Sequence, residues 1–276
     1  MKGGRSIQVV ADGDGAAVRK RAAALARELS LPSGAYGEAS SSRLVLGVGV
    51  DAVELREASA RSGRGVRVDF RSIDMRRGRG NFSRRQPLGR AIGRKNRTVV
   101  DGTAGLGHDA ALLACMGYEV LAVERSPVVA ALLRDGVQRA MDDARLAKAL
   151  GGRLRVVVGD CRDVIADMKE RPDVIYLDPM FPPKRKRGAL AKKSVRLLRE
   201  VVGDDEDAGE LLEAAIASVG DRVVVKRPAH GEALGGRPEL SVGGKLVKYD
   251  VYLACTGGGV AGGCSGAVDR AAMEEA

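Results

Sequence analysis

The chain has 276 residues, 45% of them hydrophobic, which allows one large domain or two modest ones around an aliphatic core, since there is no Trp and only three Phe. Lys and Arg outnumber Asp and Glu by ten, an excess typical of proteins that bind a polyanion. No apolar run approaches the roughly 20 residues of a membrane span, and the four cysteines lack ligand-like spacing. The sequence therefore argues against a membrane protein, a metal site and a disulfide scaffold, and it predicts a cytoplasmic protein with reduced thiols.

Residues 1–70 predict a small α+β N-terminal subdomain. The short runs SIQVV, RLVLGVGV and GVRVDF are typical of strands, and AAVRKRAAALARELS is typical of a helix. Residues 71–97 differ in composition, because they carry ten Arg or Lys and almost no acid. We interpret this segment as a basic connector with a helix that leads into the main domain.

From residue 98 to 255 the pattern alternates between strand and helix. The expected parallel strands are TVVD, YEVLAVE, LRVVVGD, DVIYLD and DRVVVK. The expected helices cover 108–117, 126–150, 163–169, 189–200 and 206–219. Such alternation predicts a Rossmann-like parallel sheet covered on both faces. ELSVGGKLVKYDVYLA predicts a closing antiparallel hairpin that turns near Gly243-Gly244, and we expect the Gly-rich tail 256–276 to be disordered.

The turn VVDGTAGLGHDAALLA is the first functional signal. The strand ends at Asp101, Gly102, Gly105 and Gly107 follow, and a helix begins near His108. Glycine lets a backbone adopt positive φ and approach a ligand, and ligands of open α/β sheets bind beyond the carboxyl ends of the strands. The spacing is not the dinucleotide G-x-G-x-x-G, and no GxxxxGK[ST] occurs, which argues against NAD and against ATP hydrolysis.

Acidic residues end the next two strands. Glu124-Arg125 ends the second, where a carboxylate can accept both ribose hydroxyls of an adenosine, and Asp160-Cys161 ends the third, where it can meet the adenine edge. Each acid alone is also typical of a helix N-cap or an exposed loop. Acids at consecutive strand ends favour a nucleoside instead. An adenosine without phosphate contacts indicates S-adenosylmethionine, with S-adenosylhomocysteine as product.

The fourth strand runs into the sequence DPMFPPKRKR. Asp178, Pro179, Met180 and Phe181 occupy the place where methyltransferases acting on base amines carry [DN]-P-P-[FYW]. A carboxylate and a carbonyl there can accept the hydrogens of an exocyclic amine and aim its lone pair at a methyl donor. An aromatic ring can stack on an extruded base. The other interpretation is a proline-rich turn with a core phenylalanine.

A run of cations follows this loop. The residues expected to grip RNA phosphates are Lys184, Arg185, Lys186, Arg187, Lys192, Lys193, Lys226 and Arg227. Charge runs are usually solvated surface, but beside a base pocket they favour phosphate contacts that position the substrate without reading its sequence.

Taken in order, DGTAGLGHDA, VERSPVVAALLRDG, YLDPMFPPKRKRGALAKK and VVVKRP resemble the RsmJ family over about residues 70 to 254. The resemblance implies a class I S-adenosylmethionine-dependent methyltransferase fold with a small N-terminal subdomain. It also implies methylation of a guanine N2 in 16S ribosomal RNA, or in the small ribosomal subunit. By motif position it assigns cofactor contacts to His108-Asp109, Glu124-Arg125, Asp160-Cys161 and Asp178.

Two other functions stay open from the residues alone. One is an adenine-N6 methyltransferase of DNA or RNA, because the same loop serves both amines. The other is a non-catalytic RNA-binding assembly factor, against which the complete glycine turn, ribose acid and DPMF loop argue.

Overall fold

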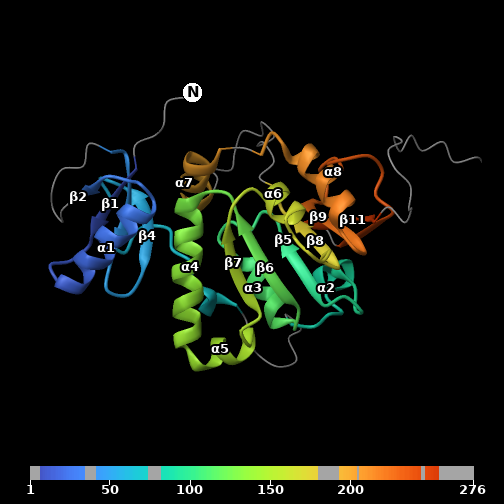
Figure 1. Ribbon diagram of the computed structural model, residues 1–276, viewed down its shortest axis with the longest axis horizontal. Helices are drawn as coiled ribbons and strands as arrows, with labels where there is room; N and C mark the ends of the chain where they lie inside the picture. Colours follow the sequence, from blue (N-terminus) through green and yellow to red (C-terminus); the bar gives the residue numbers. More distant parts are fainter. Residues whose placement is uncertain are drawn as a thin grey trace, which may run out of the picture.

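The computed structural model describes residues 7–34, 42–73, 82–179, 193–203, 205–243 and 246–254, with the backbone alone at 193–195. The larger sheet has seven strands in the order β10-β11-β9-β8-β5-β6-β7 (Figure 1). Its parallel strands are β5 (Thr98–Asp101), β6 (Glu119–Glu124), β7 (Leu154–Val158), β8 (Val174–Leu177) and β9 (Arg222–Pro228). β10 (Leu240–Gly243) and β11 (Val247–Leu253) add the antiparallel hairpin at one edge. The expected class I architecture is confirmed.

Helices cover both faces of this sheet because successive strand residues point to opposite sides. In β8, Val174 and Tyr176 belong to one buried cluster, and Ile175 and Leu177 to the other. The first cluster includes residues from α2 (Pro87–Ile92), α3 (His108–Cys115), α4 (Pro127–Asp142), α5 (Ala144–Leu150) and α7 (Lys193–Val202). The second includes residues from α6 (Cys161–Ala166) and α8 (Ala208–Ser218). Among the described helices, none combines the length and apolar character needed to cross a bilayer.

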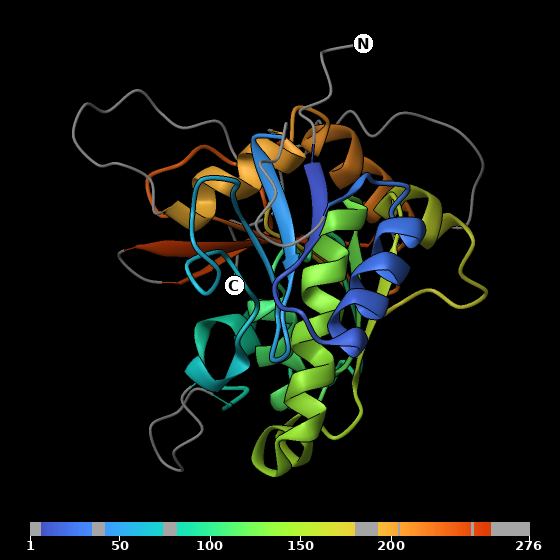
Figure 2. The same cartoon turned by 90° about the vertical axis from the view of Figure 1, so that its left-hand side faces the viewer.

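The N-terminal part forms a second, four-stranded sheet in the order β2-β1-β3-β4. Its elements are β1 (Ile7–Ala11), α1 (Ala16–Glu28), β2 (Ser33–Gly34), β3 (Leu44–Val48) and β4 (Val53–Glu57), followed by the 3-10 helix η1 (Phe70–Ser72). β1 lies parallel to β2 and β3, whereas β3 and β4 are antiparallel. This sheet stands beside the main domain, with α4 between the two (Figure 1, Figure 2).

The contact between the two sheets is centred on α4. Asp135 in α4 accepts the backbone N–H of Val53 at 3.1 Å and also pairs with Arg21 of α1. The next residue, Gly136, lets the backbone approach closely, because a Cβ there would lie 2.3 Å from Cγ1 of Val68. The N-terminal core and the α4 face of the main sheet therefore form one continuous apolar cluster.

Two local expectations were wrong. GVRVDF is not a strand: Val66 makes a single bridge to Leu55, and the sheet is completed by VELRE instead. Charged residues made this strand difficult to predict from the sequence. Arg56 and Glu54 are nevertheless both buried, and they pair with each other at 3.1 Å. The helix expected over 126–150 is divided at Asp143, whose carboxylate accepts the N–H groups of the first turn of α5.

Candidate active site

A pocket of about 370 Å³ opens at the carboxyl ends of β5, β6, β7 and β8. The turn after β5 forms one wall, while Leu198 and Val202 of α7 and Leu211 of α8 contribute apolar surface. Seven carboxylate side chains line it, but only three lysine or arginine side chains. In a chain whose net charge is +10, this pocket is locally acidic and suits a ligand that carries positive charge.

The glycine turn is packed tightly on its protein side. A Cβ on Gly102 would lie 2.6 Å from Sγ of Cys161, and one on Gly107 would lie 2.3 Å from Cδ1 of Leu133. Gly105 has φ +53°, and a Cβ there would meet nothing closer than a carbonyl at 4.0 Å. The backbone at Gly105 is therefore open, while the rest of the turn is held against the fold.

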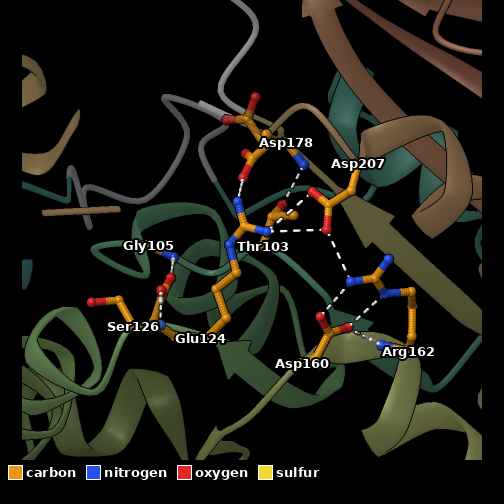
Figure 3. Close-up of polar contacts among 10 residues, drawn as sticks. Thr103, Gly105, Glu124, Ser126, Asp160, Arg162, Asp178 and Asp207 are labelled. Atoms are coloured by element: carbon orange, nitrogen blue, oxygen red, sulfur yellow. Dashed lines mark hydrogen bonds and ion pairs between the residues drawn. The ribbon is translucent and has the colours of Figure 1, made fainter. Parts of the chain in front are cut away.

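Glu124, at the end of β6, is fixed by two backbone donors (Figure 3). Gly105 N–H donates to Oε2 at 2.8 Å and Ser126 N–H donates to Oε1 at 2.7 Å. Burial raises the pKa of this carboxyl group, while the two N–H groups act in the opposite direction. Each oxygen keeps a second lone pair, so the group can accept two further hydroxyl donors.

Asp101, at the end of β5, is almost fully buried in the pocket wall. Its pKa is raised well above the ordinary value, mainly by burial and then by the neighbouring charge of Asp109. The N–H of Thr103, at 3.3 Å, opposes this shift. Asp101 is therefore held toward its protonated, hydrogen-bond-donating form.

Asp160 and Cys161 have different surroundings. Asp160 caps α6, accepting the N–H of Arg162 at 2.9 Å, and it also pairs with the Arg162 guanidinium at 2.7 Å (Figure 3). That side-chain hydrogen bond lowers the pKa of Asp160. Cys161 is buried behind the glycine turn, and burial raises the pKa of its thiol to about 12. Both residues line the pocket, although the N-cap also explains Asp160 structurally.

An ion-pair network that the sequence did not suggest joins the strand ends to the segment before α8. Arg125 pairs with Asp205 and, at 3.1 Å, with Asp207. Arg162 donates to the same Asp207 at 2.9 Å (Figure 3). It also donates to Glu210 at 3.0 Å. Asp205 and Asp207 lie 80 or more residues from Arg125 in the chain. The acidic run before α8 was therefore the only sequence signal for this network.

Asp178 lines the same pocket as Gly105 and Glu124. Its backbone N–H donates to Oγ1 of Thr103 at 2.6 Å, which ties the end of β8 to the glycine turn (Figure 3). Its side chain is 41% exposed, and its Oδ2 accepts from Lys226 at 2.9 Å. Loss of hydration raises the pKa of Asp178, and Lys226 acts against that shift.

Lys226 of β9, expected among the RNA contacts, lies inside the pocket. Besides Asp178, its ammonium group donates to Oδ2 of Asp109 at 2.7 Å. The same oxygen accepts the hydroxyl of Tyr176, a fully buried residue of β8, at 2.5 Å. Tyr176 was not singled out from the sequence, although it lies two residues before the strand-end acid.

The remaining predicted residues are more scattered. His108 begins α3, lines the pocket and contacts Phe70 edge-on, with ring centroids 6.1 Å apart. Arg227 pairs with buried Asp250 and donates to the carbonyl of Gly231 at 2.8 Å. Lys193 is the first residue of α7. Met180, Phe181, residues 184–187 and Lys192 lie outside the described residues.

The described part of the basic connector lies away from the pocket. Residues 94–97 immediately precede β5, and the N–H of Arg97 donates to Asp173, just before β8, at 2.7 Å. Those are the amino ends of the parallel strands, whereas the pocket opens at their carboxyl ends. Residues 94–97 of the connector therefore lie at the edge of the sheet opposite the pocket.

Comparison with known proteins defines the class. Residues 25–254 match the family model SAM_MT, which describes SAM-dependent methyltransferases. The crystal structure of a SAM-dependent methyltransferase from Neisseria gonorrhoeae superposes with a TM-score of 0.68 at 29% identity, covering 92% of this chain and 98% of that one. The fold, the glycine turn and the pocket are therefore those of an S-adenosylmethionine-dependent methyltransferase.

Two curated relatives carry the assignment to a particular family. Ribosomal RNA small subunit methyltransferase J of Thioalkalivibrio sulfidiphilus is 46% identical over 86% of this chain and 94% of its own length. The protein of the same name from Stutzerimonas stutzeri is 42% identical over 82% and 88%. The chain belongs to the ribosomal RNA small subunit methyltransferase J family.

The residues present fit S-adenosylmethionine. The open backbone at Gly105 and the free lone pairs of Glu124 suit an adenosine ribose, and the acidic lining suits a sulfonium and an ammonium group. Glu124 could therefore hold the ribose, and the pocket lined by Asp101 and Asp178 could hold the rest of the cofactor.

Proposed function

We propose that this protein methylates the exocyclic N2 amine of a guanosine in 16S ribosomal RNA. The observation that carries the proposal is Asp178: its partly exposed carboxylate lines the pocket to which Gly105 and Glu124 belong. The relatives' printed name supports ribosomal RNA of the small subunit as the substrate class. The net charge of +10 agrees with a nucleic-acid substrate.

The chemistry needs an acceptor for the amine's hydrogens. A purine amine is a weak nucleophile because its lone pair is delocalised into the ring. If Asp178 and the carbonyl of Pro179 accept its two N–H groups, the nitrogen is oriented and its lone pair becomes available. Orientation of this kind contributes several kcal/mol to a transfer step.

The cofactor supplies an electrophilic methyl group attached to a sulfonium. Glu124 would hold the ribose beside the open backbone at Gly105, and Asp178 at the end of β8 lines the same pocket. Thr103 accepts the backbone N–H of Asp178 at 2.6 Å, which ties the glycine turn to the residue proposed to accept the amine.

The amine must also release a proton after methylation. Asp178 pairs with Lys226 through Oδ2, and Oδ1 is the atom left to receive an N–H and then hold that proton. Because Asp178 is partly exposed, the proton can pass from there to water.

The substrate side of the proposal rests on sequence. Phe181 offers a ring on which the extruded guanine stacks, and residues 184–187 and 192–193 grip the flanking phosphates. Arg227 contributes less, because its guanidinium is held by Asp250 and neighbouring carbonyls.

Mass spectrometry of nucleosides tests the proposal. Purified protein is incubated with isotopically methyl-labelled cofactor and with 16S rRNA or small subunits that lack the modification, and the RNA is digested. Labelled N2-methylguanosine is the expected product. Labelled N6-methyladenosine would contradict the base assignment, and absence of label in all RNA would contradict the function.

A further inference from the structure

Lys226 is half-buried and pairs with two acids, which are not the surroundings of an RNA-binding lysine. We propose that Lys226 is a positioning residue, which holds Asp178 by one carboxylate oxygen and leaves the other to accept an N–H of the substrate amine. This inference rests on the proposed function, since it assigns the amine to Asp178.

The geometry restricts Asp178 to one orientation. Lys226 Nζ lies 2.9 Å from Oδ2, and the backbone N–H of the same residue is fixed by Thr103 at 2.6 Å. One anchor from the glycine turn therefore fixes the backbone of Asp178, and one from β9 fixes its carboxylate. The side chain is nevertheless 41% exposed and lines the pocket, so we take the second oxygen as the one that meets the substrate.

Lys226 is itself anchored from a third element. Asp109 in the first turn of α3 accepts from Lys226 at 2.7 Å, and its oxygen is also fixed by the hydroxyl of buried Tyr176. The four side chains therefore form a chain of hydrogen bonds that runs from Tyr176 through Asp109 and Lys226 to Asp178. A lysine has three N–H donors, and two of them are used here.

Charge supports the same role. Loss of hydration would lower the pKa of Lys226, but Asp109 and Asp178 outweigh it, raise the pKa and keep the side chain charged. That charge in turn opposes the desolvation that raises the pKa of Asp178. Among the described residues, the titratable groups around Asp178 are Asp101, Asp109, Tyr176, Asp205, Lys226 and Tyr249. Lys226 is the one cation among these six, so its charge favours the ionised form of Asp178.

Two variants test the inference, with single-turnover rates measured from pH 5 to 9 on whichever RNA amine the protein labels. Lys226→Met is expected to lower the rate at pH 7 about 10- to 100-fold, because the acceptor oxygen is misplaced. It should also move the acidic limb of the pH profile to higher pH, since removing the cation raises the pKa of Asp178. Lys226→Arg retains the charge and should keep the limb near its original position.

Two binding measurements separate this role from others. Calorimetry with S-adenosylhomocysteine should give an unchanged Kd for Lys226→Met, which also reports that the pocket is folded. A large rise in that Kd with an unmoved pH limb would make Lys226 a cofactor contact and overturn the inference. A loss of RNA affinity and of its salt dependence, with rate and pH limb unchanged at saturation, would make it a phosphate contact and also overturn it.

Failure of the proposed function would give results that differ from failure of the Lys226 inference. If the parent protein methylates adenine instead of guanine, the base assignment is wrong. Asp178 would still face an amine, and the methylation rates of the Lys226 variants would then be compared on adenine. If the parent labels no RNA amine, both proposals are wrong.

Discussion

Replacing Glu124 by alanine tests the cofactor site most sharply. The change removes the acceptor of Gly105 N–H at 2.8 Å and of Ser126 N–H at 2.7 Å, and it removes the two remaining lone pairs assigned to the ribose hydroxyls. A hydrogen bond to a charged group contributes about 1.5–3 kcal/mol, so losing two of them weakens binding by at least about 3 kcal/mol. We therefore expect the Kd for S-adenosylhomocysteine to rise by roughly 100-fold or more.

Isothermal calorimetry measures this change directly. Glu119→Ala is the matched control, because Glu119 begins the same strand at its other end and is exposed outside the pocket. Circular dichroism on both variants reports whether the fold is kept. A Kd for Glu124→Ala that stays within a few-fold of the parent, in a folded protein, would refute the assignment of the ribose to this carboxylate.

Two further predictions concern stability. Asp101 has a pKa raised by burial, so folding favours its protonated form and the parent loses stability as pH rises above the unfolded pKa. Asp101→Asn should therefore unfold with a higher free energy than the parent, by a margin that grows as pH rises between the unfolded and the folded pKa of Asp101, by at most about 1.4 kcal/mol per pH unit. A margin independent of pH in denaturant titrations would contradict this. Gly136→Ala should destabilise the protein by about 1–3 kcal/mol, because its Cβ would meet Val68. Gly209→Ala in α8, where the Cβ meets open space, should instead be neutral or stabilising. If both glycine variants changed the melting temperature equally, the packing explanation would be ruled out.

The fold could be predicted because its signals are local. Short aliphatic runs such as TVVD and DRVVVK alternate with helical patterns, and parallel strands bring their carboxyl ends to one edge. That rule alone places Asp101, Glu124 and Asp178 around one pocket, as the structure shows. The strand VELRE could not be predicted, because its two buried charges, Glu54 and Arg56, are satisfied by pairing inside the fold.

The partners within the pocket depend on tertiary structure and could not be predicted. Lys226 precedes an arginine and resembles the other cations in sequence, yet α3 brings Asp109 next to it from 117 positions away. Arg125 likewise meets Asp207 across 82 positions. Neither spacing has a periodic signal, since both pairs arise from how helices pack on the ends of the sheet.

The central claim is that Asp178 directs the substrate amine toward the methyl donor, and Asp178→Ala tests it most directly. Single-turnover methylation of 16S rRNA or small subunits is compared with Asp167→Ala, an exposed acid at the end of α6 outside the pocket. Loss of transfer is expected in the first variant and normal transfer in the second, with RNA still bound by both. Transfer at the parent rate by Asp178→Ala would contradict the account.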